Sequence, residues 1–202
     1  MEAATATLGQ PKPQAPRSLP RPRAVRKERF DTLEKFMRLK PEDGYKYEWN
    51  NGIIEKSPKM IIPANFFIVQ RLNRLAQQTA AHKAGSELIA EPGTMASATQ
   101  LRIPDMGFYT REQIAAARKG GFPVPNFAIE FVSDHDAYKK VLRKLDEYFQ
   151  AGAQVIWLVF PELERVYVYT SPVDVMICQG SRVCSAAPVA DDFQIAAEAL
   201  FA

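Results

Sequence analysis

The stretch between residues 127 and 160 most constrains the fold of this 202-residue chain. Two almost wholly apolar runs, 127–132 and 155–160, flank a segment, 136–152, in which apolar residues recur at helical spacing. Gly152 suits the C-terminal end of that helix. A helix between two buried strands predicts a right-handed crossover that joins a parallel pair. We therefore predict an α/β fold with these two strands in the central sheet.

Shorter patterns predict the elements around this unit. Asn50-Asn51-Gly52 is a strong signal for a tight turn, so it predicts an antiparallel hairpin between 45–49 and 53–55. Asp31 and Glu34 have the spacing of a capping box and mark the start of a short helix. The other expected elements are a long amphipathic helix over 63–81, strands near 88–91, 101–109, 165–170 and 175–178, and a closing helix over 193–200.

The N-terminal residues 1–28 differ from the rest in composition, with five prolines and few large apolar side chains. We expect a disordered basic tail there, followed by a single domain over residues 29–202. Residues 1–29 hold seven Lys or Arg and two Glu, a charge of +5, whereas the whole chain carries +3, which leaves −2 for the remainder. The tail is either a phosphate-contacting segment or an inert linker, and the domain lacks the charge of a globally basic nucleic-acid binder.

Composition and cysteine content narrow the class of protein. Apolar residues make up 47% of the chain and charged residues 24%, which is ordinary for a globular protein with a sizeable core. No apolar run approaches the roughly 20 residues of a membrane-spanning helix, and a signal peptide's apolar stretch is missing. We therefore expect a cytoplasmic protein without a membrane partner. Cys178 and Cys184 are expected to be reduced thiols on a late strand and a loop.

Three ionisable residues occur where a core-building sequence would avoid them: Asp105 after Pro104, Glu130 within an apolar strand, and Lys144 on the crossover helix. If the two strands are neighbours, both carboxylates point to one face and are able to hold a hard divalent cation. Such a cation would activate water and stabilise charge on a phosphoryl oxygen. Alternatively, Glu130 is a solvated strand-end residue, Asp105 belongs to a turn, and Lys144 is an ordinary solvated lysine.

The position of Lys144 follows from helical spacing alone. With Leu145 as the centre, the apolar stripe of 138–152 spans roughly −60° to +60°, and Lys144 lies at about −100°. A lysine at this border buries its stem and extends its ammonium past the edge. We therefore predict that the Lys144 ammonium lies within salt-bridge or one-water distance of Asp105 or Glu130. Lys140 and Arg143, at roughly −140° and 160°, are expected to face solvent.

An ordered set of motifs resembles the Uma2 (DUF820) family of restriction endonucleases, which are similar to PD-(D/E)XK nucleases. The motifs are Gly44-Tyr45-Lys46-Tyr47-Glu48, Gly52-Ile53-Ile54-Glu55, Ser57-Pro58, Ile103-Pro104-Asp105, Ile129-Glu130-Phe131-Val132-Ser133, Lys144-Leu145-Asp146-Glu147-Tyr148, Ala151-Gly152 and Ile156-Trp157-Leu158-Val159. The resemblance covers about residues 30–202. It implies a restriction-endonuclease-like αβββαβ core with a central mixed sheet, an extra N-terminal hairpin and peripheral strands.

The resemblance also implies roles for the charged residues. Asp105 and Glu130 would bind Mg²⁺ or Mn²⁺, Glu48 would be an auxiliary ligand, and Lys144 would orient or activate water. In the simplest motif the lysine lies two residues after the glutamate, where this chain has Val132. Glu48 is alternatively an exposed strand residue.

Two departures from the family pattern concern residues near the expected site. Relatives carry a His near the start of the long helix, where this chain has Ala64, Asn65 and Phe66, and an Asp before Pro161, where this chain has Phe160. Neither change removes an expected metal ligand. His82 and His135 have no partner at metal-site spacing and are expected to be surface residues.

Three classes of function remain open from the sequence. The leading hypothesis is a magnesium- or manganese-dependent endonuclease that hydrolyses phosphodiester bonds of DNA. The second is a nucleic-acid-binding or regulatory module that keeps the nuclease fold without efficient catalysis. The third is a structural protein-interaction domain, in which the three charged residues would be exposed and unrelated. A homodimer would supply two sites for cutting both strands.

Overall fold

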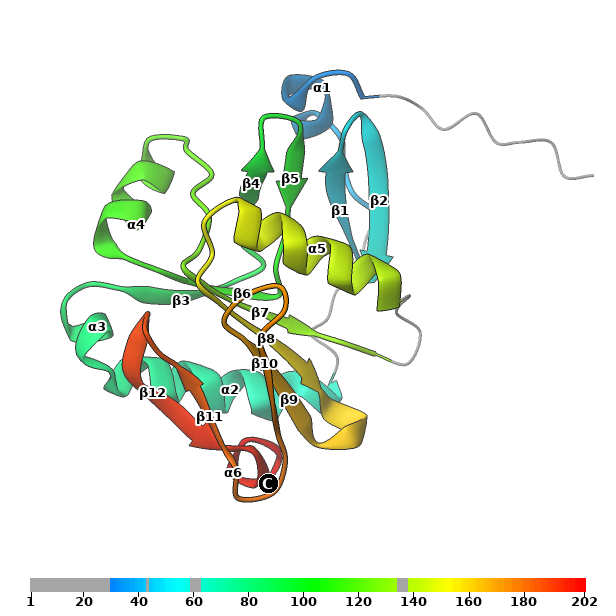
Figure 1. Cartoon of the computed structure of the whole chain (residues 1–202). Coiled ribbons are helices and arrows are strands. Elements are labelled where there is room, and N and C mark those ends of the chain that lie inside the picture. The colour runs from blue at the N-terminus through cyan, green and yellow to red at the C-terminus, as the bar shows by residue number, and fades with distance from the viewer. Residues whose placement is uncertain (1–29, 43, 59–62, 134–137) are drawn as a thin grey trace, which may run out of the picture.

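A computed structural model describes residues 30–42, 44–58, 63–133 and 138–202. The predicted tail over 1–28 and His135 lie outside these residues. The centre of the fold is a six-stranded sheet in the order β10-β9-β8-β7-β6-β3 (Figure 1). Its strands are β3 (Glu87–Ala90), β6 (Met106–Tyr109), β7 (Phe127–Phe131), β8 (Val155–Phe160), β9 (Arg165–Tyr169) and β10 (Val175–Cys178).

The predicted parallel pair is confirmed. Strands β7 and β8 are parallel, with Phe127 opposite Val155 and Glu130 opposite Leu158, and α5 (Tyr138–Gln150) connects them. Gly152 has φ +107° just after this helix, a conformation that a residue with a Cβ rarely adopts. The other four pairings in this sheet are antiparallel, so the sheet is mixed.

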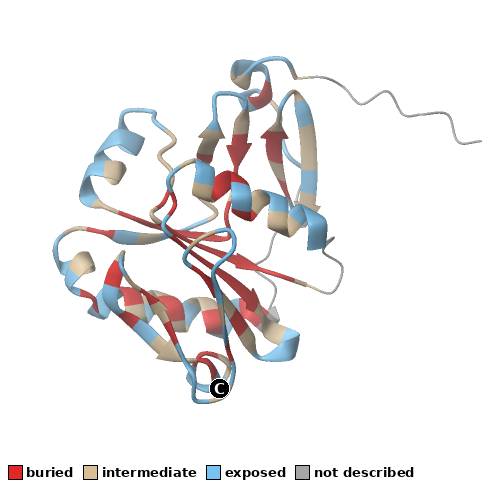
Figure 2. Ribbon diagram, viewed as in Figure 1, coloured by how far each residue is buried: buried red, intermediate tan, exposed pale blue. Residues whose placement is uncertain are grey.

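The order of the core elements matches the predicted αβββαβ arrangement. It consists of α2 (Pro63–Gln78), β3, β6, β7, α5 and β8. Figure 1 shows α2 and α5 on opposite sides of the six-stranded sheet. Alternate residues of β7 follow this division: Ile129 packs in the cluster that includes α2, and Ala128 in the cluster that includes α5. Both central strands are buried throughout most of their length (Figure 2), and Glu130 therefore faces α5.

The predicted hairpin belongs to a second, four-stranded sheet in the order β2-β1-β5-β4. Its strands are β1 (Tyr45–Asn50), β2 (Ile53–Pro58), β4 (Thr94–Ser97) and β5 (Gln100–Arg102). Asn51 and Gly52 both have positive φ, at 51° and 81°, as the tight turn requires. The single strand expected over 101–109 is wrong: the chain leaves β5 at Ile103-Pro104 and begins β6 in the other sheet. Asp105 consequently lies in the crossing between the two sheets, immediately before β6.

Several peripheral elements differ from the sequence-based expectations. The helix expected over 193–200 is half strand, because Phe193 and Ile195 alternate with polar residues in β12 (Ala190–Ala196) before α6 (Ala197–Phe201) begins. Thr32, rather than Asp31, caps α1. The remaining elements are α1 (Leu33–Met37), α3 (Ala80–Lys83), α4 (Arg111–Arg118), the 3₁₀ turn η1 (Pro161–Leu163) and β11 (Val183–Ala186).

Both cysteines are free and buried, as expected, although Cys184 lies in β11 rather than in a loop. Within the described ranges, no helix is long and apolar enough to cross a membrane.

Candidate active site

A cavity of about 740 Å³ lies where the two sheets meet. Strand β1 contributes Lys46 and Glu48 to its lining, and β7 contributes Glu130. Asp105 comes from the crossing between the sheets, and Lys144 comes from α5. The cavity therefore brings together all four residues predicted to be metal-binding or catalytic, together with a lysine that the sequence analysis did not select.

Asp105 is held by two donors from different parts of the fold. The Lys46 ammonium lies 2.6 Å from Oδ1 and also donates to the Ile103 carbonyl at 3.0 Å. The backbone N–H of Phe131 donates to Oδ2 at 2.7 Å. Because Phe131 directly follows Glu130, this bond fixes Asp105 against the glutamate-bearing strand. Asp105 and Lys46 are only 5% and 6% exposed, so the pair is shielded from solvent.

Glu130 is paired with Lys144, as the helical spacing predicts. The Lys144 ammonium lies 2.7 Å from Glu130 Oε1 and 3.1 Å from Glu48 Oε1. The Tyr148 hydroxyl, one turn further along α5, donates to the same Glu130 oxygen at 2.9 Å. Glu130 is 8% exposed, and its Oε2 makes no hydrogen bond to a described residue. The alternatives in which Glu130 and Lys144 are solvated are therefore wrong. The hypothesis of a structural protein-interaction domain is wrong as well, because it requires these charged residues to be exposed and unrelated.

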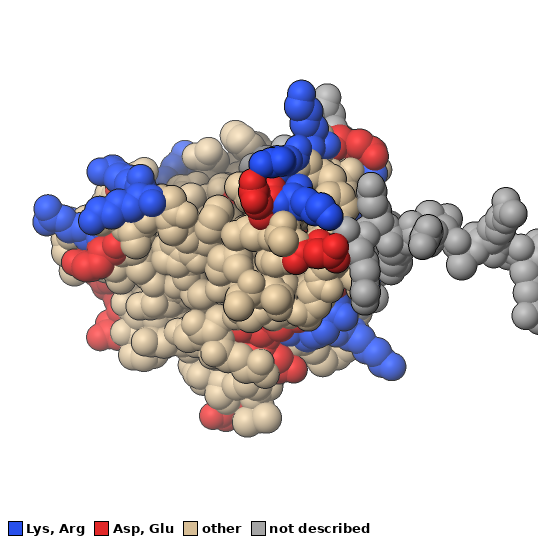
Figure 3. Space-filling view, turned by 90° about the horizontal axis from the view of Figure 1, so that it is seen from above, with Lys and Arg blue, Asp and Glu red and all other residues tan. Residues whose placement is uncertain are grey.

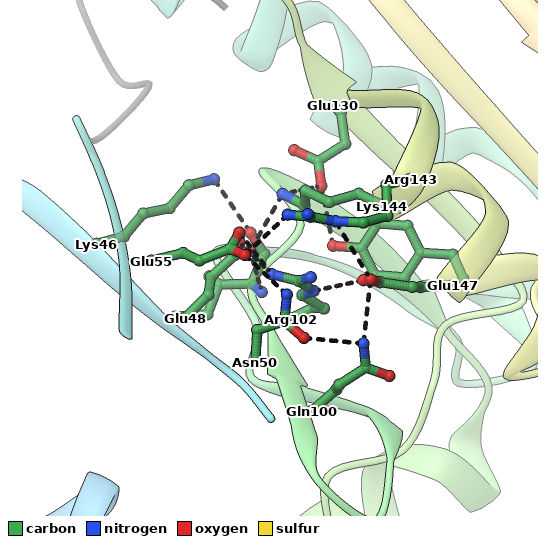
Figure 4. A network of polar contacts seen from close by, with 12 residues as sticks. Lys46, Glu48, Asn50, Glu55, Gln100, Arg102, Glu130, Arg143, Lys144 and Glu147 are labelled. Carbon is green, nitrogen blue, oxygen red and sulfur yellow. Dashed lines mark hydrogen bonds and ion pairs between the residues drawn. The ribbon is translucent and has the colours of Figure 1, made fainter. Parts of the chain in front are cut away.

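Glu48 is buried and not an exposed strand residue. Its Oε1 accepts from the Ile103 N–H at 2.8 Å, and its Oε2 accepts from Arg102 at 3.3 Å. Figure 4 shows Lys46 and Glu48 approaching from the hairpin, and Glu130 and Lys144 from the opposite side. The carboxylates and the ammonium groups thus alternate across the junction of the two sheets.

Arg102 is the centre of a second layer of ion pairs behind this site. It is fully buried and binds Glu147 of α5 at 2.6 Å and Glu55 of the hairpin at 3.1 Å (Figure 4). Arg143 faces solvent, as expected, with its side chain 47% exposed, and it also pairs with Glu55 at 2.8 Å, because the hairpin packs beside α5. Arg102 Nη2 has no hydrogen-bond partner among the described residues. This layer joins the hairpin, β5 and α5.

The electrostatic environment follows from burial and from these neighbours. Burial raises the pKa of the Asp105 carboxyl to about 7; the Lys46 ammonium opposes this shift and the Glu130 carboxylate adds to it. Burial disfavours the charged form of Lys144, but the carboxylates of Glu130, Glu48 and Asp105 outweigh burial and raise its pKa. Three carboxylates thus face two ammonium groups, and the Arg102 guanidinium contacts Glu48 from behind.

The donor set suits a hard divalent cation. Mg²⁺ prefers oxygen ligands and is commonly bound through one or two carboxylates, with water or substrate phosphate completing its shell. Asp105 and Glu130 meet this requirement, and the lysine ammonium groups on their oxygens show that the position attracts positive charge. In the described part of the chain, no three His, Cys, Asp or Glu side chains stand close enough together to hold a metal ion. The fit is therefore to a two-carboxylate site.

The sequence analysis missed Lys46 and Arg102 as site residues, and it assigned no role to Tyr148. Lys46 lies in an alternating hairpin strand, where a lysine ordinarily faces solvent, and its partner Asp105 is 59 residues away. Arg102 stands near the end of a three-residue strand and gives no sequence signal. Among the described residues, the His82 ring contacts the Ser86 carbonyl and Glu87, and His82 does not line the cavity.

Comparisons with known proteins identify the family and the fold. Residues 33–198 match the model of the Uma2 family, which is described as "Putative restriction endonuclease". The fold is similar to a crystal structure from Anabaena variabilis ATCC 29413 described as "a putative nuclease belonging to DUF820". That match has a TM-score of 0.71 at 18% identity and covers 84% of this chain and 97% of the other. At this identity the likeness establishes a shared fold. The comparison with curated proteins found no match.

Proposed function

Because the chain belongs to the Uma2 family, we propose that it is a divalent-metal-dependent endonuclease that hydrolyses phosphodiester bonds of DNA. The observation that carries this proposal is the convergence of Asp105, Glu130 and Lys144 from three separate elements in one cavity. A solvated surface would not hold these groups together at 2.6 to 3.1 Å from their partners.

Each residue has a proposed role in this chemistry. Asp105 and Glu130 would hold Mg²⁺ or Mn²⁺, and Glu48, whose oxygen pairs with Lys144, would become an auxiliary ligand only after that pair separates. The bound ion would lower the pKa of a water molecule and stabilise negative charge on the phosphoryl oxygens. Lys144 then orients the attacking water or a phosphate oxygen, because its ammonium lies beside Glu130. Tyr148 fixes the Glu130 carboxylate by hydrogen bonding.

A cleavage assay tests the proposal. Plasmid, linear duplex and single-stranded DNA are incubated with the purified chain in EDTA, Mg²⁺ or Mn²⁺. Cleavage should require the metal and should disappear in Asp105→Ala and Glu130→Ala, while Lys144→Ala should lose about 100-fold or more. Asp191→Ala is the matched control, since Asp191 is exposed on β12 and lies outside the cavity lining. Wild-type cutting by the Asp105 or Glu130 variant would place the activity elsewhere.

One observation favours a second candidate, a nucleic-acid-binding module without efficient catalysis. Lys46 already occupies the Asp105 oxygen Oδ1, so a metal ion must displace an ammonium that is buried and doubly bonded. Binding of DNA without cleavage in any metal would support this module. Cutting of both strands, if it is observed, is most simply explained by a homodimer, which sedimentation analysis would detect.

A further inference from the structure

An exposed aromatic ring lines the same cavity as the candidate catalytic residues. Phe67, in the second turn of α2, is 67% exposed and belongs to the cavity wall. Its neighbour Phe66 is 48% exposed and does not line the cavity. The two rings contact each other edge-on, with their centroids 5.9 Å apart. A large ring left in water at the wall of a polar site is available for contact with a planar apolar group of a ligand.

The carboxylates lie at the bottom of this cavity rather than at its rim. Asp105 and Glu130 are 5% and 8% exposed, so a scissile phosphate must enter the cavity to reach them. In a duplex the base faces are stacked on one another and are hidden from a protein side chain. An unpaired strand is flexible, and its bases offer their faces to aromatic rings. The buried floor and the exposed ring thus favour the same form of nucleic acid.

The charges around the cavity indicate how such a strand lies. Lys140 is exposed, lines the cavity one helical turn before Lys144, and forms no ion pair with a described residue. Arg71 is engaged by the Leu200 and Ala202 carbonyl oxygens. Glu162 and Glu164 line the cavity at η1 and repel phosphate from that wall. A phosphate at this cavity is therefore expected beside Lys140 of α5 rather than beside η1.

The face of the molecule seen in Figure 3 does not offer a charged track for a duplex. Viewed from above, positive and negative side chains lie near the edges of the molecule with uncharged surface between them, and this face has no continuous basic stripe (Figure 3). A protein that reads duplex backbone over many phosphates needs such a stripe.

We infer that the cavity binds an unpaired stretch of nucleic acid, with a base stacked on Phe67 and a phosphate held by Lys140. This inference deepens the proposed nuclease function by naming the substrate form as single-stranded. Its binding step does not depend on cleavage, so the two proposals fail separately.

The test measures binding of the full chain in EDTA, where a metal-dependent enzyme does not cut. Fluorescence anisotropy is recorded for labelled oligo(dT) and oligo(rU) of about 12 nucleotides and for a blunt duplex of the same length. Both single strands should bind more tightly than the duplex. Comparing the affinity for oligo(dT) with that for oligo(rU) distinguishes a preference for DNA from one for RNA. Phe67→Ala should weaken single-strand binding by about 5-fold to 150-fold, the range for one stacked base.

Three variants separate stacking from other effects. Phe66→Ala removes the same ring from the adjacent, non-lining position and should change affinity less than about 2-fold. Phe67→Trp should retain or improve binding, because tryptophan also stacks on bases. Lys140→Ala should reduce the slope of log affinity against log salt by about 0.7, as expected for one phosphate contact on a single strand. Circular dichroism confirms that each variant is folded.

Two outcomes would overturn the inference. One is that Phe67→Ala shows no selective loss of single-strand binding, either because its affinity equals that of wild type or because its affinity for the duplex falls by the same factor. The other is that wild type sediments as a dimer, and that Phe67→Ala and Phe66→Ala both sediment as monomers with unchanged single-strand binding. These rings would then form an interface between two copies of the chain. Single-strand binding that depends on Phe67, in a protein that never cuts, would support the inference and refute the proposed endonuclease.

Discussion

The buried carboxylate of Asp105 has a consequence for stability that can be measured directly. Its pKa is raised from 3.8 to about 7, so the folded state binds a proton more tightly than the unfolded state between these values. Unfolding free energy therefore falls as pH rises from about 4 to about 7 and is flat above. At about 1.36 kcal/mol per pKa unit, the full effect is about 4 kcal/mol, most of which lies between pH 5 and pH 8.

Asp105→Asn removes this titration while keeping the side-chain shape. The variant's stability relative to wild type should therefore increase by about 3 kcal/mol from pH 5 to pH 8. Urea unfolding at both pH values, followed by the fluorescence of the buried Trp49 and Trp157, gives the two differences. Asparagine leaves one hydrogen-bond donor unpaired, and the cost of this does not depend on pH. It therefore cancels when the difference in unfolding free energy between variant and wild type at pH 5 is compared with that at pH 8.

Glu55→Gln is the matched control from the same site. Burial raises the pKa of Glu55, but the hydrogen bond from Asn50 and the charges of Arg102 and Arg143 outweigh it, so the pKa lies below its usual value of 4.5. The stability that Glu55 contributes is present above about 4.5 and is lost at lower pH, so its difference from wild type should be constant between pH 5 and pH 8. A difference for Asp105→Asn that is also constant, within about 0.5 kcal/mol, would refute the reasoning.

Other predictions concern the ion pairs and the tail. Arg102→Leu should cost about 3 to 5 kcal/mol in urea unfolding because it leaves buried carboxylates unpaired, whereas Arg143→Ala, a half-exposed residue, should cost about 1 kcal/mol or less; similar costs would contradict the central position of Arg102. Lys46→Met should tighten Mg²⁺ binding about tenfold, because the ammonium and the metal compete for Asp105. Calorimetry without nucleic acid measures this affinity, and weaker binding by the variant would argue against competition. A chain shortened to begin at Arg29 should bind nucleic acid more weakly and with a flatter salt dependence; unchanged affinity at low salt would identify residues 1–28 as an inert linker.

The parts of the fold that sequence predicted are those whose signal is local. The β7-α5-β8 unit follows from two apolar runs and one helical stripe, and the turn at Asn51-Gly52 follows from its need for positive φ. The single strand predicted over 101–109 was wrong. Pro104 marks a break in the chain, but it does not indicate that the residues before and after it belong to different sheets. Helix α4 was overlooked although Thr110 and Gln113 form a capping box.

The candidate site divides in the same way. Lys144 was placed correctly because one helix determines both its angle and its reach. Lys46 was not predicted because its burial results from the docking of two sheets whose contacting residues are far apart in sequence. Glu48 was selected only through a family resemblance, since an alternating hairpin strand does not reveal which of its faces another sheet will cover. Tertiary contacts, not local pattern, decide those positions.

The attachment of the hairpin has a consequence for local opening of the molecule. Strand β1 pairs with β2 over six positions but with β5 at only two, Trp49 with Leu101 and Asn50 with Gln100. The remaining connection consists of a small apolar cluster around Trp49 and Leu101 and of side-chain ion pairs, among them Lys46 with Asp105. The hairpin is therefore a unit that can separate before the six-stranded sheet unfolds, and its amide protons should exchange with solvent sooner than those of β7 and β8. A cation that displaces Lys46 removes one of these attachments, so ion binding and seating of the hairpin oppose each other.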